Sequence, residues 1–158
     1  MTLALADGLG HGAEAAMAAE RFCAFARDHE ESPLDEILRG AHAVLAGTRG
    51  AAAALLRVDT QRHKASFVGV GNIELRADSE HAIHPVCTPG IVGTRVKQVL
   101  VFSYPLARGD LLVMHSDGVE GLRDLSSYRN RSPQDVADTV LATFRVTRDD
   151  ATCIVVRV

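Results

Sequence analysis

The sequence predicts an α+β fold in which helices flank an antiparallel β-sandwich, in the layer order α-β-β-α. Three observations support this. Helical patterns stand near both ends of the chain, apolar runs rich in Val, Ile and Leu fill the middle, and the connections between runs are short enough for hairpins. The chain has 158 residues, 47% apolar and 23% charged, which suits one globular domain over residues 1–158.

The N-terminal segment predicts a strand followed by a helix. Residues 2–6 form a short apolar run, and an alanine-rich stretch follows at residues 14–29. Phe22, Phe25 and Ala26 recur at helical spacing there, so we expect them to share one face. The turn between the two elements, ADGLGHG, holds three glycines and a histidine, which is more turn chemistry than a simple connection needs.

Two further helices begin with the same sequence pattern. Ser32 and Ser132 are expected as N-caps, with Pro33 and Pro133 at the first helical position and an aspartate in the first turn. Apolar residues then recur at helical spacing and should face the core. They are Leu34, Ile37, Leu38, Ala41 and Leu45 in one helix and Val136, Ala137, Val140, Leu141 and Phe144 in the other.

Between these two helices the chain predicts antiparallel strands, because short β-branched and aliphatic runs alternate with turn residues. The expected strands are residues 51–59, 64–70, 73–77, 81–86, 96–104 and 110–116, and residues 151–158 supply a last one. Asp59 to Gln61 and Asp78 to Glu80 are expected as hairpin connections. The polar stretch from Leu122 to Arg131 reads as a surface loop.

Composition argues against several classes of protein. The formal charge is −3 and no basic stripe is present, so we expect no nucleic-acid partner. No apolar run reaches the roughly 18 residues of a membrane span and no secretory signal is visible, so we expect a soluble, cytoplasmic protein without a membrane partner. Cys23, Cys87 and Cys153 lie in apolar surroundings without paired spacing, which favours buried reduced thiols over disulfides or zinc.

Three aspartates stand where strand-like runs meet turns, and we interpret them as one metal site. They are Asp7 in ALADGLGHG, Asp117 in LLVMHSDGV and Asp149 in RDDATCIVVRV. Hard divalent cations such as Mg²⁺ or Mn²⁺ prefer oxygen ligands, and carboxylates from separate strand ends can converge on one ion. Gly8 could add its carbonyl oxygen. The glycines after Asp7 and Asp117 would allow a close approach of the backbone, having no side chain and tolerating positive φ. Each Asp-Gly could instead be an ordinary turn.

Such a site would suit phosphate-ester hydrolysis. Divalent ions bind phosphate oxygens and lower the pKa of a bound water, which gives a nucleophile without a covalent enzyme intermediate. The chain shows no Cys-x5-Arg phosphate loop, GxSxG elbow or P-loop. His11 lies close to Asp7 in the sequence and could protonate the leaving oxygen, although it could also only bond the loop.

The motifs ADGLGHG, HSDG and DDAT, in this order, with RGAAAALLRVD and FVGVGNIELR between them, resemble a known family. They are similar to those of the PPM-type metal-dependent serine/threonine phosphatases, and within these to the bacterial SpoIIE branch, nearest its small stressosome-feedback phosphatases. The resemblance covers nearly the whole chain. It implies a two-layer antiparallel sandwich flanked by helices, with a centre of two Mn²⁺ or Mg²⁺ ions at one end.

The resemblance also implies roles and partners. Asp7 would bridge the two ions, the Gly8 carbonyl would bind one, and Asp117 and Asp149 would hold the other. Substrates of the branch are phosphoserine or phosphothreonine on small STAS-domain regulators, such as anti-anti-sigma factors and stressosome proteins. Dephosphorylation there resets a partner-switching signal.

One departure from the family pattern affects the second ion. Members usually carry an acidic metal ligand on a strand before the ADG strand, and the printed sequence begins at that strand. Three explanations stay open: a truncated start, completion of the site by a preceding domain or a partner, or a weakly held second ion. The missing strand should also leave a sheet edge exposed, which invites self-association. The alternative to an enzyme is a non-catalytic phosphatase-like module that binds a regulator or senses metal.

Overall fold

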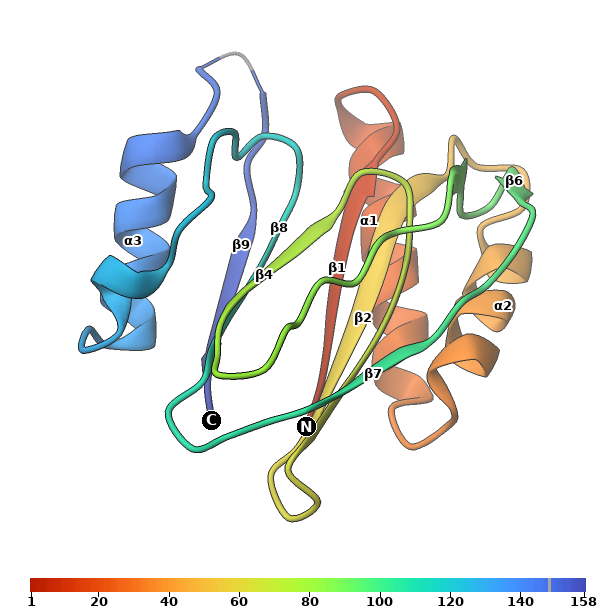
Figure 1. Ribbon diagram of the computed structural model, residues 1–158. Helices are drawn as coiled ribbons and strands as arrows, with labels where there is room; N and C mark the ends of the chain where they lie inside the picture. Colours follow the sequence, from red (N-terminus) through yellow and green to blue (C-terminus); the bar gives the residue numbers. More distant parts are fainter. Residues whose placement is uncertain (148) are drawn as a thin grey trace.

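Two antiparallel sheets pack face to face, and helices cover their outer faces (Figure 1). The structure is a computed structural model that describes residues 1–147 and 149–158. The four-stranded sheet has the order β1-β2-β3-β7 and the three-stranded sheet the order β4-β8-β9. The strands of the first are β1 (Thr2–Gly8), β2 (Ala51–Asp59), β3 (Lys64–Val70) and β7 (Phe102–Pro105); those of the second are β4 (Glu74–Asp78), β8 (Leu111–His115) and β9 (Cys153–Arg157).

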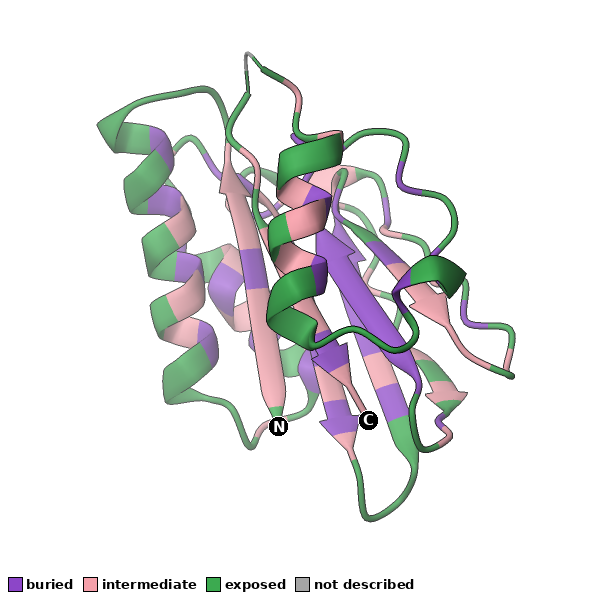
Figure 2. Ribbon diagram, turned by 90° about the vertical axis from the view of Figure 1, so that its left-hand side faces the viewer, coloured by how far each residue is buried: buried purple, intermediate pink, exposed green. Residues whose placement is uncertain are grey.

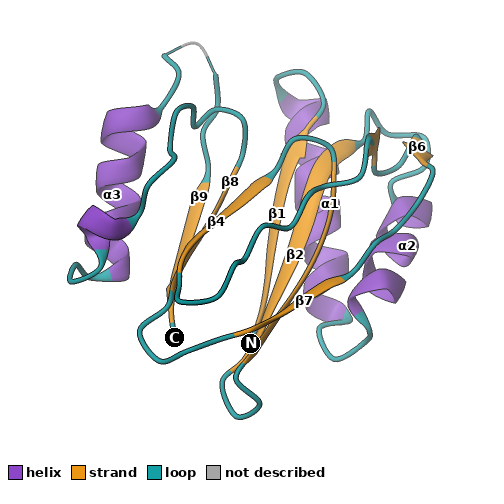
Figure 3. Cartoon of the chain, in the orientation of Figure 1, coloured by secondary structure: helices purple, strands orange, loops and turns teal. Residues whose placement is uncertain are grey.

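Helices α1 (Ala13–Asp28) and α2 (Leu34–Val44) cover the four-stranded sheet, and α3 (Pro133–Phe144) covers the three-stranded sheet (Figure 3). A short pair of strands, β5 (Gly90–Ile91) and β6 (Arg95–Val96), lies beyond the sandwich, and a 3₁₀ turn, η1 (Ser126–Tyr128), precedes α3. The predicted α-β-β-α layers are confirmed. No helix among the described residues is long and apolar enough to cross a membrane.

The core has three layers because successive strand residues point to opposite faces. On β2, Leu56 and Val58 join the core between the two sheets, whereas Ala53 and Leu55 face α1 and α2. Figure 2 shows this buried interior beneath helices whose outer faces are exposed. On β8, the alternation separates the inter-sheet core from the α3 core in the same way. Each central strand is therefore apolar on both faces, which explains its nearly continuous apolar sequence.

The helix predictions are largely confirmed. The predicted apolar stripe on α2 is buried throughout, and Val136 and Val140 are the buried residues of α3. Ser132 caps α3 by accepting a hydrogen bond from the Asp135 amide, with Pro133 in the first turn. The opening of α2 differs by one residue, because Pro33 is itself the cap and Leu34 begins the helix. Pro33 has ψ 140°, an extended value, so it stands just outside the helix instead of in its first turn.

Two strand predictions are wrong in detail. Residues 81–86 form no strand: only Ile83 is buried there, and Pro85 has no amide hydrogen to donate to a ladder. The Asp78 to Glu80 hairpin is consequently absent, and β4 pairs with β8 instead. The run at residues 96–104 is divided between β6 and β7, with an irregular connection between them. The β2–β3 hairpin at Asp59 to Gln61 is confirmed.

The stretch from Leu122 to Arg131 is less of a plain surface loop than predicted. Leu122, Leu125 and Tyr128 are buried against α3, and η1 lies within the stretch. Arg129 donates two hydrogen bonds to the Asp78 carboxylate at 2.8 and 2.7 Å. The segment is therefore held to the three-stranded sheet by both apolar packing and an ion pair.

The edge of the four-stranded sheet at β1 has a strand partner on one side only, because β1 pairs with β2 alone in the described chain. This is the exposed edge that the sequence predicts. Pairing of β1 with β2 sets Asp7 opposite Ala52, and pairing of β8 with β9 sets His115 opposite Cys153. Asp117 follows the His115 end of β8 and Asp149 precedes the Cys153 end of β9, and both line one pocket with Asp7, so the two sheets bring acidic residues to the same end of the sandwich.

Candidate metal centre

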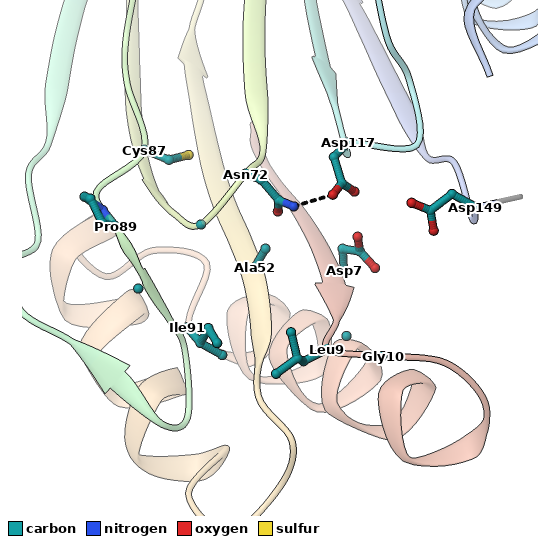
Figure 4. Close-up of a pocket in the computed structure, with 13 residues that line it drawn as sticks. Asp7, Leu9, Gly10, Ala52, Asn72, Cys87, Pro89, Ile91, Asp117 and Asp149 are labelled. Atoms are coloured by element: carbon teal, nitrogen blue, oxygen red, sulfur yellow. Dashed lines mark hydrogen bonds between the residues drawn. The ribbon is translucent and has the colours of Figure 1, made fainter. Parts of the chain in front are cut away.

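A pocket of about 620 Å³ opens at this end of the sandwich. All three predicted aspartates line it, together with Gly8 and Asn72 among others. Figure 4 shows the carboxylates of Asp7, Asp117 and Asp149 turned toward a common space. The site prediction made from three distant motifs therefore corresponds to one place in the fold.

Asp7 reaches the pocket from the end of β1. The next residue, Gly8, allows the backbone of α1 to pack closely against this strand. A Cβ at Gly8 would lie 2.0 Å from the carbonyl oxygen of Ala15 on α1. Gly8 does not have a positive φ, so that part of the expectation is wrong. The glycine is needed because the helix backbone packs against it, and any side chain would push α1 away from the aspartate-bearing strand.

Asp117 and Asp149 come from the facing ends of β8 and β9. The Ser116 amide donates to the Thr152 carbonyl and the Thr152 amide donates to the Ser116 hydroxyl oxygen, both at 3.1 Å. These bonds join the two segments that carry the aspartates. A Cβ at Gly118 would lie 2.1 Å from the Asp150 carbonyl oxygen, so this glycine too is required by close backbone packing. It does not require positive φ either.

Asn72, in the turn between β3 and β4, is a site residue that the sequence reasoning missed. Its side-chain amide donates a 2.5 Å hydrogen bond to Asp117 Oδ2, drawn as a dashed line in Figure 4. This bond fixes the orientation of the Asp117 carboxylate from the neighbouring sheet connection. A signal was present in the sequence, since GVGN places a lone polar amide directly after an apolar strand and a glycine.

The pocket concentrates negative charge. Burial first, and then the nearby carboxylates of Asp117, Asp149 and Asp150, together raise the pKa of Asp7 to about 6. In the part of the chain that the structure describes, no lysine or arginine forms an ion pair with Asp7 or Asp117. A cation from outside the chain would relieve this repulsion, which is the electrostatic setting of a metal site.

The residues present fit a hard divalent cation. Carboxylate oxygens and a backbone carbonyl are the donors that Mg²⁺ and Mn²⁺ prefer. Within residues 1–147 and 149–158, no three His, Cys, Asp or Glu side chains stand close enough together to ligate one ion by themselves. As placed, the three aspartates would therefore share an ion only with water molecules linking at least one carboxylate to it, and Mg²⁺ commonly keeps several waters.

The other candidate side chains lie apart from the carboxylates or are inert. His11 is exposed and is not among the residues that line the pocket. His115 is buried, with its Nδ1 2.9 Å from the Ser116 carbonyl, and does not line the pocket. Cys87 does line it, but its thiol donates to the Ile73 carbonyl and burial raises its pKa to about 12. Cys87 is thus protonated at neutral pH and is no nucleophile.

Comparison with known proteins identifies relatives of this fold and site. The model of the family "Stage II sporulation protein E (SpoIIE)" matches residues 1–158. The phosphoserine phosphatase RsbX of Bacillus subtilis (strain 168) is 21% identical over 155 residues, covering 96% of this chain and 77% of RsbX. The family match spans the positions of all three aspartate motifs.

Two solved structures share the fold closely. One, from work on the bacterial stressosome as a modular system adapted to control secondary messenger signalling, has a TM-score of 0.90 and 36% identity. The match covers 98% of this chain and 82% of the chain in that structure. The second is RsbX in complex with magnesium, with a TM-score of 0.84, 18% identity and coverage of 98% and 78%. At that identity the RsbX structure shows a common fold alone.

Proposed function

Because the chain belongs to the SpoIIE family of metal-dependent protein phosphatases, we propose that it hydrolyses phosphoserine or phosphothreonine on a regulatory protein. The observation that carries this proposal is the convergence of Asp7, Asp117 and Asp149 on one pocket from two different sheets. Three ordinary turns would have no reason to gather uncompensated carboxylates at one point, since their mutual repulsion costs stability.

We assign the aspartates as metal ligands. Asp7 would bridge two ions of Mg²⁺ or Mn²⁺, the Gly8 carbonyl would bind one of them, and Asp117 and Asp149 would hold the other. Ions bound there supply Lewis-acid binding of phosphate oxygens and a water of lowered pKa. The ion held by Asp7 and Gly8 would be the more weakly bound, because this assignment gives it fewer carboxylates of this chain.

The protein's own groups position and shield this chemistry. Asn72 donates a hydrogen bond to Asp117 Oδ2 and would so orient that carboxylate toward an ion. Gly8 and Gly118 keep the two aspartate-bearing turns in fixed contact with neighbouring backbone. His11, exposed on the turn after Asp7, remains a candidate proton donor to the leaving oxygen, a role that requires it to turn toward bound substrate.

The substrate we propose is a phosphorylated STAS-type regulator of a partner-switching system. We propose that the phosphatase acts on it in the cytoplasm. The support is that one relative is the phosphoserine phosphatase RsbX and that the structure with 36% identity comes from work on the stressosome. Removal of the phosphate would reset the binding preference of that regulator.

The experiment is hydrolysis of a phosphoserine-bearing STAS protein and of an aryl phosphate, with Mn²⁺ titrated against a chelator. Metal-dependent turnover that disappears in Asp117→Asn supports the enzyme, with Asp28→Asn as the control because Asp28 is an exposed carboxylate at the end of α1. Full activity in Asp117→Asn would overturn the site assignment. Metal binding without any turnover would favour the alternative, a non-catalytic binding or metal-sensing module.

A further inference from the structure

A second pocket, of about 410 Å³, adjoins the metal pocket. The two share Pro89 and Gly90, and the second is lined in addition by Thr88, Gln98 and two cationic side chains, Arg95 and Lys97. The proposed function does not use this pocket. Its position beside the carboxylates means that a protein segment whose phosphorylated residue enters the metal pocket would pass close to it.

The two pockets have opposite charge. The metal pocket holds three aspartates, and the chain as a whole has a formal charge of −3. Arg95 and Lys97 are nevertheless exposed, and no described carboxylate lies within ion-pair distance of either. Two cations without acidic partners inside a concave surface attract an anion from outside.

The backbone that carries these cations is fixed to the rest of the fold. Val92 exchanges two backbone hydrogen bonds with Ala51, at 2.9 and 3.0 Å, and Thr88 bonds to Gly69 and Gly71 across the end of β3. The Thr88 hydroxyl donates to the Gln98 carbonyl at 2.9 Å. These contacts anchor the segment at Thr88 and Val92 and tie Gln98 back to Thr88, so Arg95 and Lys97 rest on a preorganised support.

A contact with α2 fixes the turn between β5 and β6. The Gly93 amide donates to His42 Nδ1 at 2.9 Å, and Gly93 packs so closely on Leu45 that a Cβ would lie 2.7 Å from the Leu45 Cβ. The cations follow this turn directly. A support that is ordered before binding loses little conformational entropy when a ligand arrives, which favours selective recognition.

We propose that Arg95 and Lys97 form an anion subsite that binds an acidic side chain near the phosphorylated residue of the protein substrate. This inference rests on the proposed phosphatase function and adds a preference: substrates with Glu, Asp or a second phosphate close to the target residue are dephosphorylated better than neutral ones. The shared chemistry is an anionic group within reach of both pockets, and the test separates carboxylate from phosphate.

The test measures kcat/KM for three phosphoserine peptides that differ only in flanking residues: neutral, glutamate-rich, and carrying a second phosphoserine. The wild-type chain should prefer an anionic peptide by about threefold to thirtyfold, the range expected for one or two exposed ion pairs. The preference should fall as salt rises. In the double variant Arg95→Gln with Lys97→Gln, the ratio of anionic to neutral peptide should fall to about one.

The matched control is Arg39→Gln with Lys64→Gln. It removes the same charge from an exposed face of α2 and from the start of β3, which lies at the opposite end of the strand from the pockets. The control should keep the preference. Equal rates on all three peptides in the wild type, or an unchanged ratio in the Arg95 and Lys97 variant, would overturn the subsite.

The two proposals fail in distinguishable ways. Metal-dependent hydrolysis of an aryl phosphate without any preference among the peptides contradicts the subsite and leaves the phosphatase standing. Loss of all metal-dependent hydrolysis contradicts the phosphatase itself. A preference for the doubly phosphorylated peptide alone would show that the subsite requires a phosphate. A preference for the glutamate peptide as well would show that a carboxylate is sufficient.

Discussion

Replacing Asp7 by asparagine should stabilise the metal-free protein while destroying its metal-dependent function. Asp7 has its pKa raised from 3.8 to about 6 by burial and by neighbouring carboxylates. A carboxyl whose pKa is higher in the folded state destabilises the fold once it ionises. The penalty is absent below about pH 4, grows between pH 4 and 6, and is complete above pH 6.

The magnitude follows from that shift. One pKa unit corresponds to about 1.4 kcal/mol, so the shift sets an upper limit of about 3 kcal/mol. Because Asp7 is only half-buried, solvent screening reduces this to about 1 to 1.5 kcal/mol. In a chain of this size such a gain raises the thermal midpoint by about 2 to 6 °C.

The assay is thermal and urea unfolding of wild type, Asp7→Asn and the control Asp28→Asn, in chelator, at pH 8 and at pH 4. Asp7→Asn should unfold at a higher temperature than wild type at pH 8, and the difference should vanish near pH 4. Added Mn²⁺ should stabilise the wild type by mass action and stabilise Asp7→Asn less, because only Asp117 and Asp149 remain as carboxylate ligands. A metal-free Asp7→Asn protein less stable than wild type at pH 8 would refute the reasoning.

Three further predictions concern the fold around the site. Gly8→Ala puts a Cβ 2.0 Å from the Ala15 carbonyl, so its free energy of unfolding in urea should fall by about 3 kcal/mol; an unchanged midpoint would contradict this. The Arg129 hydrogen bonds lower the pKa of Asp78, so the stability they contribute is present above about pH 4 and is lost as the pH falls through the lowered value. Asp78→Asn should therefore show a smaller fall in urea midpoint between pH 6 and pH 3, and an equal fall would argue against the pair. Self-association through the β1 edge should appear as a scattering mass that rises with protein concentration, and a monomer at every concentration would exclude it.

Much of the architecture could be predicted because its signals are local. The opening Ser-Pro before α3 and the apolar stripe on α2 depend on residues within one or two helical turns, and both are confirmed. The aspartates were found for a related reason, since each stands where an apolar run breaks. Their convergence on one pocket matches the prediction, whereas their roles as ligands and the extent of the domain remain predictions.

The parts that were missed depend on contacts far apart in the sequence. The short strands β5 and β6 are positioned by the pairing of Val92 with Ala51, 41 residues earlier, so their own residues carry little strand pattern. Asn72 matters because its amide meets Asp117, 45 residues later; the lone amide after GVG marks the position but does not reveal this partner. The prediction for residues 81–86 failed for the opposite reason: an apolar alternation is present locally, but no strand among the described residues pairs with it.

The two sheets divide the candidate ligands between them, with Asp7 on one and Asp117 and Asp149 at the facing end of the other. The separation of the carboxylates therefore depends on the apolar layer between the sheets, which residues such as Leu5, Phe67 and Met114 build. Core side chains that no substrate touches act as a spacer for the metal centre. If the aspartates ligate metal as proposed, a change of one methylene in that layer should change the affinity for the ion, because a close-packed interior transmits such a change to the sheets.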